Sequence, residues 1–200
     1  NAAPGFRMHI EPAEGLARNV AEPVIDMLFP DRSNGRIPII AITGTNGKTT
    51  ISRLIAELIS SQGQGCAVMG TTGNGILPNL TPSTHTTLDA LHLQQALHDY
   101  AKQGANFVAL EASSHGLEQG RLNGCDLEIA VYSNLSRDHL DYHGTLEAYA
   151  EAKALLFKFT TLKVVVINID DAHANVMLTA ASIPVNGFCS STTCPKRPRF

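Results

Sequence analysis

Residues 37–50, IPIIAITGTNGKTT, decide the fold of this chain. The first seven are almost all apolar, which is typical of a strand buried on both faces of a parallel sheet. The segment that follows, TTISRLIAELISSQ (49–62), has one apolar stripe at helical spacing, formed by Ile51, Leu54, Ile55, Leu58 and Ile59. The pattern predicts a buried strand, a glycine-containing turn and an amphipathic helix.

The turn GTNGKTT indicates a phosphate-binding loop. Glycines let backbone N–H groups turn toward an anion, and the start of the helix adds a partial positive charge. Lys48 suits the β- and γ-phosphates of a nucleotide, and Thr49 suits a magnesium ion. The strict P-loop pattern has Gly where this chain has Ile42, and a glycine turn alone needs no ligand. We predict a nucleotide site formed by Gly44, Thr45, Asn46, Gly47, Lys48, Thr49 and Thr50.

Further strands and helices alternate after this unit. Near-continuous apolar runs predict strands at 66–71, 107–112, 129–134 and 164–169, and helices are expected at 88–103 and 145–158. Gly63 and Gly65 are placed to end the first helix. Such repetition predicts right-handed crossovers and a mostly parallel, three-layer open α/β sheet over residues 37–181. Ligands of such sheets bind beyond the carboxyl ends of the strands.

The ends of the chain differ from this domain. Residues 1–36 are rich in Pro, Gly, Asn and Asp and suggest an irregular connector, and residues 182–200 suggest no element. The net charge of −3 argues against a nucleic-acid binder, and no apolar run reaches the roughly 20 residues of a membrane span. Cys66 and Cys125 lie in or beside apolar runs, so we expect buried free thiols and a reducing cytoplasm.

Several motifs resemble the Mur ligases, which join carboxylates to amines through an acyl phosphate. Besides GTNGKTT they are AVMGTTGNG (67–75), STHTTLDA (83–90), EASSHGLEQGR (111–121) and NLSRDHLDYHG (134–144). They are most similar to the members that add diaminopimelate or lysine to UDP-N-acetylmuramoyl-L-alanyl-D-glutamate in peptidoglycan synthesis. The resemblance runs from about residue 40 to about residue 180. It implies the central, P-loop-type ATP-binding domain of this family, with ATP and Mg²⁺ as cofactors.

The first 50 residues resemble another enzyme with a Mur-like domain, cyanophycin synthetase. The similarity lies in NAAPGFRMHIEPAEG (1–15), RNVAEPVIDMLFP (18–30) and the passage into GTNGKTT. The chain therefore looks like a mosaic joined near the phosphate loop. On this resemblance, we expect no counterpart of the uridine-binding and carboxyl-terminal domains of a Mur ligase within these 200 residues.

Two residues at or after the ends of predicted strands suit a metal ion. Glu111 ends one strand and His139 follows the next, so both are expected at the carboxyl edge of the sheet. The spacing of His139 and His143 also permits zinc on a helix, but the glutamate of the zinc motif is missing. The resemblance implies that Thr49, Glu111 and His139 hold magnesium. It also implies that Lys153, which spacing alone makes an ordinary solvated lysine, becomes a carbamate ligand.

The resemblance also implies a substrate site. Its contacts to the muramoyl-dipeptide would come from Thr86, Thr87, Ser113, Gln119 and Arg121. A guanidinium such as that of Arg121 binds carboxylates in bidentate fashion. Asn168 and Asp171, after the last predicted strand, are expected to border the adenine.

The leading hypothesis is thus a fragment of a cytoplasmic ATP-dependent ligase, with Lys48, Lys153 and His139 as its catalytic residues. Its small-molecule partners would be the UDP-muramoyl-dipeptide and an amino acid, with no nucleic acid or membrane. One alternative is a fragment of cyanophycin synthetase, which extends an Asp/Arg polymer. Another is a nucleotide-binding module that is inactive by itself.

Overall fold

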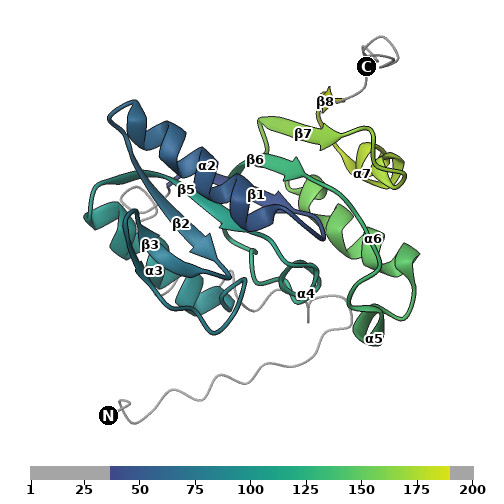
Figure 1. The fold of residues 1–200 in the computed structure, drawn as a ribbon, viewed down its shortest axis with the longest axis horizontal. Coiled ribbons are helices and arrows are strands. Elements are labelled where there is room, and N and C mark those ends of the chain that lie inside the picture. Colours follow the sequence, from purple (N-terminus) through teal and green to yellow (C-terminus); the bar gives the residue numbers. More distant parts are fainter. Residues whose placement is uncertain (1–36, 190–200) are drawn as a thin grey trace, which may run out of the picture.

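The computed structural model describes residues 37–189, which form an open eight-stranded sheet with helices on both faces (Figure 1). The predicted connector, residues 1–36, lies outside the described residues. The strands are β1 (Ile39–Thr43), β2 (Gly65–Gly70), β3 (Gly73–Ile76), β4 (Asn79–Thr81), β5 (Ala105–Glu111), β6 (Leu127–Tyr132), β7 (Val164–Asn168) and β8 (Val185–Phe188). The helices are α2 (Lys48–Ser61), α3 (Ala90–Lys102), α4 (Ser114–Glu118), α5 (Leu140–His143), α6 (Leu146–Ala154), the 3₁₀ turn η2 (Leu155–Lys158) and α7 (Ala174–Ala180).

The strand order is β4-β3-β2-β5-β1-β6-β7-β8. The run from β2 to β8 is parallel, and β3 and β4 are antiparallel to their neighbours. This confirms the predicted mostly parallel α/β sheet. The first strand is central, with β5 on one side and β6 on the other, so the loops after all three strands meet at one edge.

The sequence patterns did not predict the short helices α4, α5 and α7, the hairpin of β3 and β4, or the strand β8. The hairpin of β3 and β4 is rich in glycine, and the φ angles of Gly73 and Gly75 are 121° and 151°. A Cβ atom on either glycine would collide with a backbone carbonyl of β4, so the close pairing itself requires these glycines. The expectation that no element follows residue 181 was wrong. The edge strand β8 pairs with β7 through its backbone and is largely exposed, so it has no apolar run to reveal it.

The helices cover two separate hydrophobic cores. On one face, Ile51, Ile55 and Ile59 of α2 pack over β1, β2 and β5, while α3, α4, α6 and α7 cover the other face. The predicted stripe of α2 was wrong in part, because Leu54 and Leu58 are 52% and 66% exposed. The helix instead buries the small residues Ser52 and Ala56, which let it approach the sheet closely.

The remaining local predictions are mostly confirmed. The helix expected at 88–103 is α3, and the one expected at 145–158 is α6 followed by η2. Gly63, with a φ of 78°, ends α2 just after its C-cap, whereas Gly65 already belongs to β2 and takes no part in the cap. Both Cys66 and Cys125 are buried free thiols.

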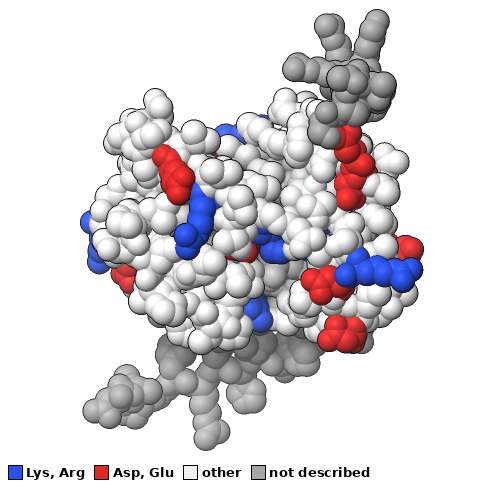
Figure 2. Space-filling model, in the orientation of Figure 1, with Lys and Arg blue, Asp and Glu red and all other residues white. Residues whose placement is uncertain are grey.

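The surface in Figure 2 carries scattered charges of both signs, with no extended patch of one sign on this face. Within residues 37–189, no helix has the length and apolar character needed to span a bilayer.

Candidate functional site

The turn between β1 and α2 has the shape of a phosphate-binding loop. Gly44 and Gly47 have φ angles of 142° and 86°, which side chains rarely allow. A Cβ atom on Gly44 would overlap the hydroxyl of Ser133, so the loop needs glycine there for space as well. Gly47 is the N-cap of α2, and it makes no side-chain cap. The first N–H groups of α2 are therefore left for a ligand.

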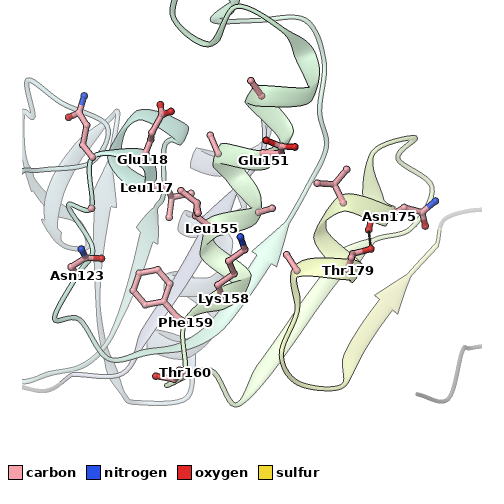
Figure 3. Close-up of a pocket in the computed structure, with 17 residues that line it drawn as sticks. Leu117, Glu118, Asn123, Glu151, Leu155, Lys158, Phe159, Thr160, Asn175 and Thr179 are labelled. Atoms are coloured by element: carbon pink, nitrogen blue, oxygen red, sulfur yellow. Dashed lines mark hydrogen bonds between the residues drawn. The ribbon is translucent and has the colours of Figure 1, made fainter. Parts of the chain in front are cut away.

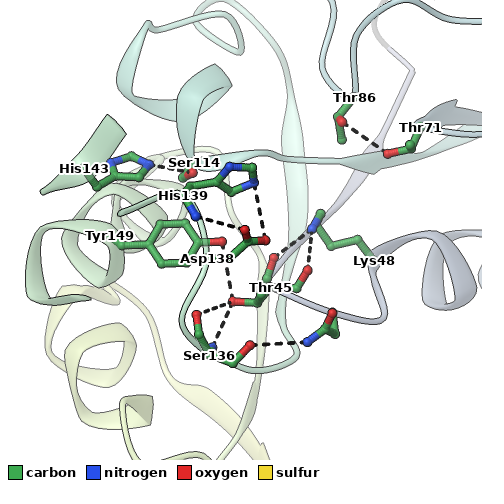
Figure 4. A network of polar contacts seen from close by, with 12 residues as sticks. Thr45, Lys48, Thr71, Thr86, Ser114, Ser136, Asp138, His139, His143 and Tyr149 are labelled. Carbon is green, nitrogen blue, oxygen red and sulfur yellow. Dashed lines mark hydrogen bonds and ion pairs between the residues drawn. The ribbon is translucent and has the colours of Figure 1, made fainter. Parts of the chain in front are cut away.

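Lys48 folds back over this loop. Its ammonium group donates to the carbonyl oxygens of Gly44 and Thr45, each at 2.9 Å (Figure 4). Burial lowers the pKa of Lys48, while the nearby carboxylates of Glu111 and Asp138 act to raise it. The lysine thus lies where the phosphates of a nucleotide would add negative charge.

The carboxylate of Glu111 and the hydroxyl groups that contact it offer oxygen atoms that suit a metal ion. Only 1% of this residue is exposed, at the end of β5. Its carboxylate accepts from the Thr49 hydroxyl at 2.8 Å, and from the N–H and hydroxyl of Thr71 at 3.2 Å each. A side chain on Gly70 would collide with this carboxylate. Thr71 was not predicted as a site residue, although it follows β2 just as Glu111 ends β5.

Lys153 is a fully buried amine beside the same loop. It is 1% exposed, and its Nζ donates to the Gly44 carbonyl oxygen at 3.1 Å. The same nitrogen lies 4.1 Å from the centre of the Tyr149 ring. Burial, and then the positive charge of Lys48, lower the pKa of Lys153 to about 7, although Asp138 opposes the shift. A large fraction of the amine is therefore neutral near pH 7.5, and carbon dioxide reacts only with a neutral amine.

His139 lies in the loop after β6, in a left-handed backbone conformation with a φ of 52°. Its side chain is 49% exposed and lies 3.6 Å from the Asp138 carboxylate. Its ring is 5.1 Å from that of His115 and 6.1 Å from that of Tyr149, measured between ring centres. The side chain of His139 is thus half exposed, and its ring lies near the Tyr149 ring that Lys153 also contacts.

His143 has a different environment from His139. Its side chain is 1% exposed, and its two ring nitrogens lie 2.9 Å from the Ser114 hydroxyl and 3.6 Å from the Glu118 carboxylate. Among residues 37–189, no cluster of three or more His, Cys, Asp or Glu side chains is arranged to hold a metal. The ring nitrogens of His143 are already engaged by Ser114 and Glu118. The hydroxyl and carboxylate oxygens of Thr49 and Glu111, with one imidazole, are a donor set that hard divalent cations accept.

The residues predicted for the dipeptide form one connected network. Arg121 donates to the backbone oxygen of Thr87 at 2.6 Å and to Gln119 Oε1 at 2.9 and 2.7 Å. The hydroxyls of Thr87 and Ser113 lie 3.0 Å apart, and Thr87 also donates to the Glu111 carbonyl oxygen at 2.8 Å. The hydroxyl of Thr86 joins Thr71 at 3.2 Å (Figure 4), so the network reaches Glu111.

The two residues expected at the adenine, Asn168 and Asp171, both contact the end of β6 or the segment that follows it. The amide of Asn168 donates to the carbonyl oxygen of Ser133 at 2.8 Å. Asp171 accepts from the Tyr132 hydroxyl at 2.7 Å and from the Leu135 N–H at 2.9 Å. Both side chains thus brace the segment after β6.

A groove of about 1460 Å³ lies between α4, α6 and α7 (Figure 3). Among the predicted site residues only Gln119 lines it, while the phosphate loop and Glu111 do not. The polar groups that could bind phosphate or metal therefore lie outside this groove, at the carboxyl edge of the sheet.

Comparison with known proteins identifies the family. Residues 42–192 match the model of the Mur ligase middle domain. The UDP-N-acetylmuramoyl-L-alanyl-D-glutamate–2,6-diaminopimelate ligase of Chromobacterium violaceum is 53% identical over 136 residues, which are 68% of this chain and 28% of that enzyme. The ligase of the same name from Coxiella burnetii is 45% identical over 183 residues, with 88% and 37% covered.

Solved structures agree with this result. A structure of a UDP-N-acetylmuramoyl-L-alanyl-D-glutamate–2,6-diaminopimelate ligase matches with 68% identity and a TM-score of 0.80, over 88% of this chain and 37% of that one. Folylpolyglutamate synthase from Mycobacterium tuberculosis, at 18% identity and a TM-score of 0.66 over 84% and 46% of the two chains, shares the fold. This chain spans about a third of the length of the curated ligases it matches. It belongs to the Mur ligase family, and residues 42–192 are its middle domain.

Proposed function

We propose that this chain is the central, ATP-binding part of a ligase that adds an amino acid to UDP-N-acetylmuramoyl-L-alanyl-D-glutamate. The relatives named above are ligases for 2,6-diaminopimelate, and the same amino acid is proposed here. The buried free thiols of Cys66 and Cys125 fit an enzyme of the reducing cytoplasm.

One observation carries the proposal most directly. The ammonium groups of Lys48 and Lys153 both donate to the carbonyl oxygen of Gly44, while Thr49 of the same loop donates to Glu111. Two lysines and one carboxylate thus converge on a glycine loop at the start of a helix. Two adjacent cations repel each other unless an anion lies between them or one of them is neutral. A nucleotide triphosphate with its metal supplies such an anion at Lys48.

The same residues suit phosphoryl transfer to a carboxylate. A substrate carboxylate oxygen attacks the γ-phosphorus, the bond to the β,γ-bridging oxygen breaks, and ADP leaves. An amine then attacks the acyl phosphate, loses a proton and displaces inorganic phosphate. Catalysis of this kind depends on positioning and on neutralising charge. Lys48 would neutralise the β- and γ-phosphates, and the backbone of residues 44–50 would hold them.

Magnesium is the proposed metal, with Thr49, Glu111, His139 and the carbamate of Lys153 as its protein ligands. When bound by these residues, the ion would supply positive charge that reduces the negative charge on the transferred group. The buried amine of Lys153 has a pKa of about 7, and that leaves enough neutral amine to react with carbon dioxide. The carbamate would turn a cation into an anionic oxygen ligand and remove its repulsion with Lys48.

The network of Thr86, Thr87, Ser113, Gln119 and Arg121 is the proposed site for the muramoyl-dipeptide. It joins Glu111 through Thr71 and Thr87, so a carboxylate held there would lie close to the proposed metal and phosphates. The guanidinium group of Arg121 is the natural partner of a carboxylate in this network.

A second candidate is a nucleotide-binding module that does not form the amide bond by itself. The residues proposed for the nucleotide and the metal all lie within the match to the middle domain, so nucleotide binding is the activity that this domain supports by itself. The cyanophycin synthetase alternative depends on residues 1–36, which lie outside the described residues.

Calorimetric titration tests the proposal. The purified chain, saturated with magnesium and a non-hydrolysable ATP analogue, is titrated with the UDP-muramoyl-dipeptide and separately with a short cyanophycin primer. We expect binding of the dipeptide alone, weakened at least about tenfold by Arg121→Ala, while the exposed Lys102→Ala serves as the charge-matched control. Binding of the primer alone would overturn the substrate assignment.

A further inference from the structure

The segment 133–136, which follows β6, runs beside the phosphate loop. The N–H of Thr45 donates to the backbone oxygen of Asn134 at 2.8 Å. The Asn134 side chain also pairs with the backbone of Asn46 in both directions. Its Oδ1 accepts from the Asn46 N–H, and its Nδ2 donates to the Asn46 carbonyl oxygen, each at 3.1 Å. One carboxamide thus satisfies both main-chain polar groups of a loop residue.

Other contacts join the same two segments. The Ser133 hydroxyl donates to the Asn46 carbonyl oxygen at 2.7 Å. Figure 4 shows that Ser136 contacts Thr45, and the N–H of Ser136 donates to the Thr45 hydroxyl at 3.0 Å. The Asn46 side chain reaches Ser136 Oγ at 3.4 Å. The conformation of the loop is therefore set by contacts with the segment after β6.

That segment is itself held in place from the end of β7. Asn168 donates to the Ser133 carbonyl oxygen at 2.8 Å, and Asp171 accepts from the Leu135 N–H at 2.9 Å. The residues expected at the adenine therefore hold the segment that carries Asn134.

The consequence for the loop follows from the planar peptide bond. The carbonyl of Asn46 and the N–H of Gly47 belong to one trans peptide unit, so they point in opposite directions. Two donors, from Ser133 and Asn134, hold this carbonyl toward the segment. The N–H of Gly47 must then point away from segment 133–136, toward the side of the loop on which a phosphate would bind. Without these donors the glycine-containing peptide could rotate and present its carbonyl oxygen to an anion.

We infer that Asn134 is a positioning residue for nucleotide binding, and that its carboxamide holds the phosphate loop in the conformation that presents the Gly47 N–H to a phosphate. The inference rests on the proposed nucleotide site at residues 44–50. Its physical basis is preorganisation, because a loop already held in its bound shape loses less conformational entropy when a ligand binds.

Two substitutions of Asn134 distinguish its hydrogen-bond donor from its hydrogen-bond acceptor. Asn134→Ala removes both side-chain hydrogen bonds. Asn134→Asp keeps the acceptor for the Asn46 N–H but places a second acceptor against the Asn46 carbonyl oxygen. The matched control is Asn186→Asp, which makes the same charge change at an exposed position of β8. Each variant of the 200-residue chain is titrated with magnesium and a non-hydrolysable ATP analogue, and backbone hydrogen exchange is measured without nucleotide.

We expect Asn134→Ala to weaken nucleotide binding about tenfold, the scale of two lost hydrogen bonds, and Asn134→Asp to weaken it at least as much. Exchange at the Asn46 amide should accelerate in Asn134→Ala while the amides of β1 stay protected, and Asn186→Asp should match the wild type. A purely structural role would lower the protection of β1 together with affinity, and this result would overturn the inference.

Binding by Asn134→Ala within about twofold of the wild type, well inside the expected loss, would also overturn it. If the wild-type chain bound no nucleotide, the proposed function would fail instead. The exchange of the Asn46 amide would still report whether Asn134 holds the loop.

Discussion

Replacing Lys153 with methionine tests the electrostatics of the site through protein stability. The amine is 1% exposed, and its pKa falls from 10.5, the ordinary value for lysine, to about 7 in the folded chain. Between these two values the unfolded chain binds more protons than the folded chain. The free energy of unfolding of the wild type therefore rises with pH in this window, and the contribution is constant below and above it.

The magnitude follows from the size of the shift. One pH unit inside the window changes the free energy by about 1.4 kcal/mol. Between pH 7 and pH 9, the unfolding free energy of the wild type should therefore rise by about 2 kcal/mol relative to Lys153→Met. Groups present in both proteins largely cancel in this difference.

Urea denaturation in carbon dioxide-free buffer measures the difference at each pH. The exposed Lys158→Met, in η2 of the same helical segment, is the matched control. A difference between wild type and Lys153→Met that stays flat from pH 7 to pH 9 would refute the depressed pKa of Lys153. It would also remove the physical basis for a carbamate at this position.

Three further outcomes follow from the structure. Gly44→Ala should lower the free energy of unfolding by about 1–3 kcal/mol, because the φ of Gly44 strains any residue with a side chain and the new Cβ would overlap Ser133. Chemical denaturation measures this loss, and an unchanged denaturation midpoint would contradict the prediction. Leu58→Ser should change the free energy of unfolding by less than about 0.5 kcal/mol, since Leu58 is 66% exposed. A decrease of more than about 2 kcal/mol in the same denaturation assay would show that Leu58 is buried. Burial raises the pKa of Cys66 to about 11 and of Cys125 to about 12, so a disulfide reagent at pH 8 should modify these two thiols only in urea. Because Cys189 is partly exposed, the modified positions are assigned by peptide mass spectrometry, and rapid modification of Cys66 or Cys125 in the native chain would count against the fold.

Much of the central sheet could be predicted from the sequence, because its parallel strands are buried on both faces and leave continuous apolar runs. Strands without that burial left no such signal. The hairpin of β3 and β4 is rich in glycine and polar residues, and β8 is an exposed edge strand. Periodicity also overestimated the buried face of α2, because Leu54 and Leu58 fit the spacing but lie beyond the line of contact with the sheet.

The candidate site, like the sheet, could be predicted from the sequence only in part. The phosphate loop and Glu111 could be placed from the order of strands and turns, since both follow buried strands at one edge. The role of Lys153 could not be derived from spacing, because burial and the nearby Lys48 appear only when α6 packs beside the loop. The partners in segment 133–136 were also missed. Their contacts join residues almost 90 positions apart in the sequence.

The central claim, a nucleotide site at residues 44–50, is tested most directly by calorimetric titration of the chain with magnesium and a non-hydrolysable ATP analogue. The wild-type chain should bind one equivalent. Lys48→Ala should show no measurable binding, with an unfolding free energy within about 1 kcal/mol of the wild type, since the ammonium group of Lys48 hydrogen-bonds to carbonyl oxygens of its own loop. A folded Lys48→Ala chain that binds the nucleotide as tightly as the wild type would contradict the account.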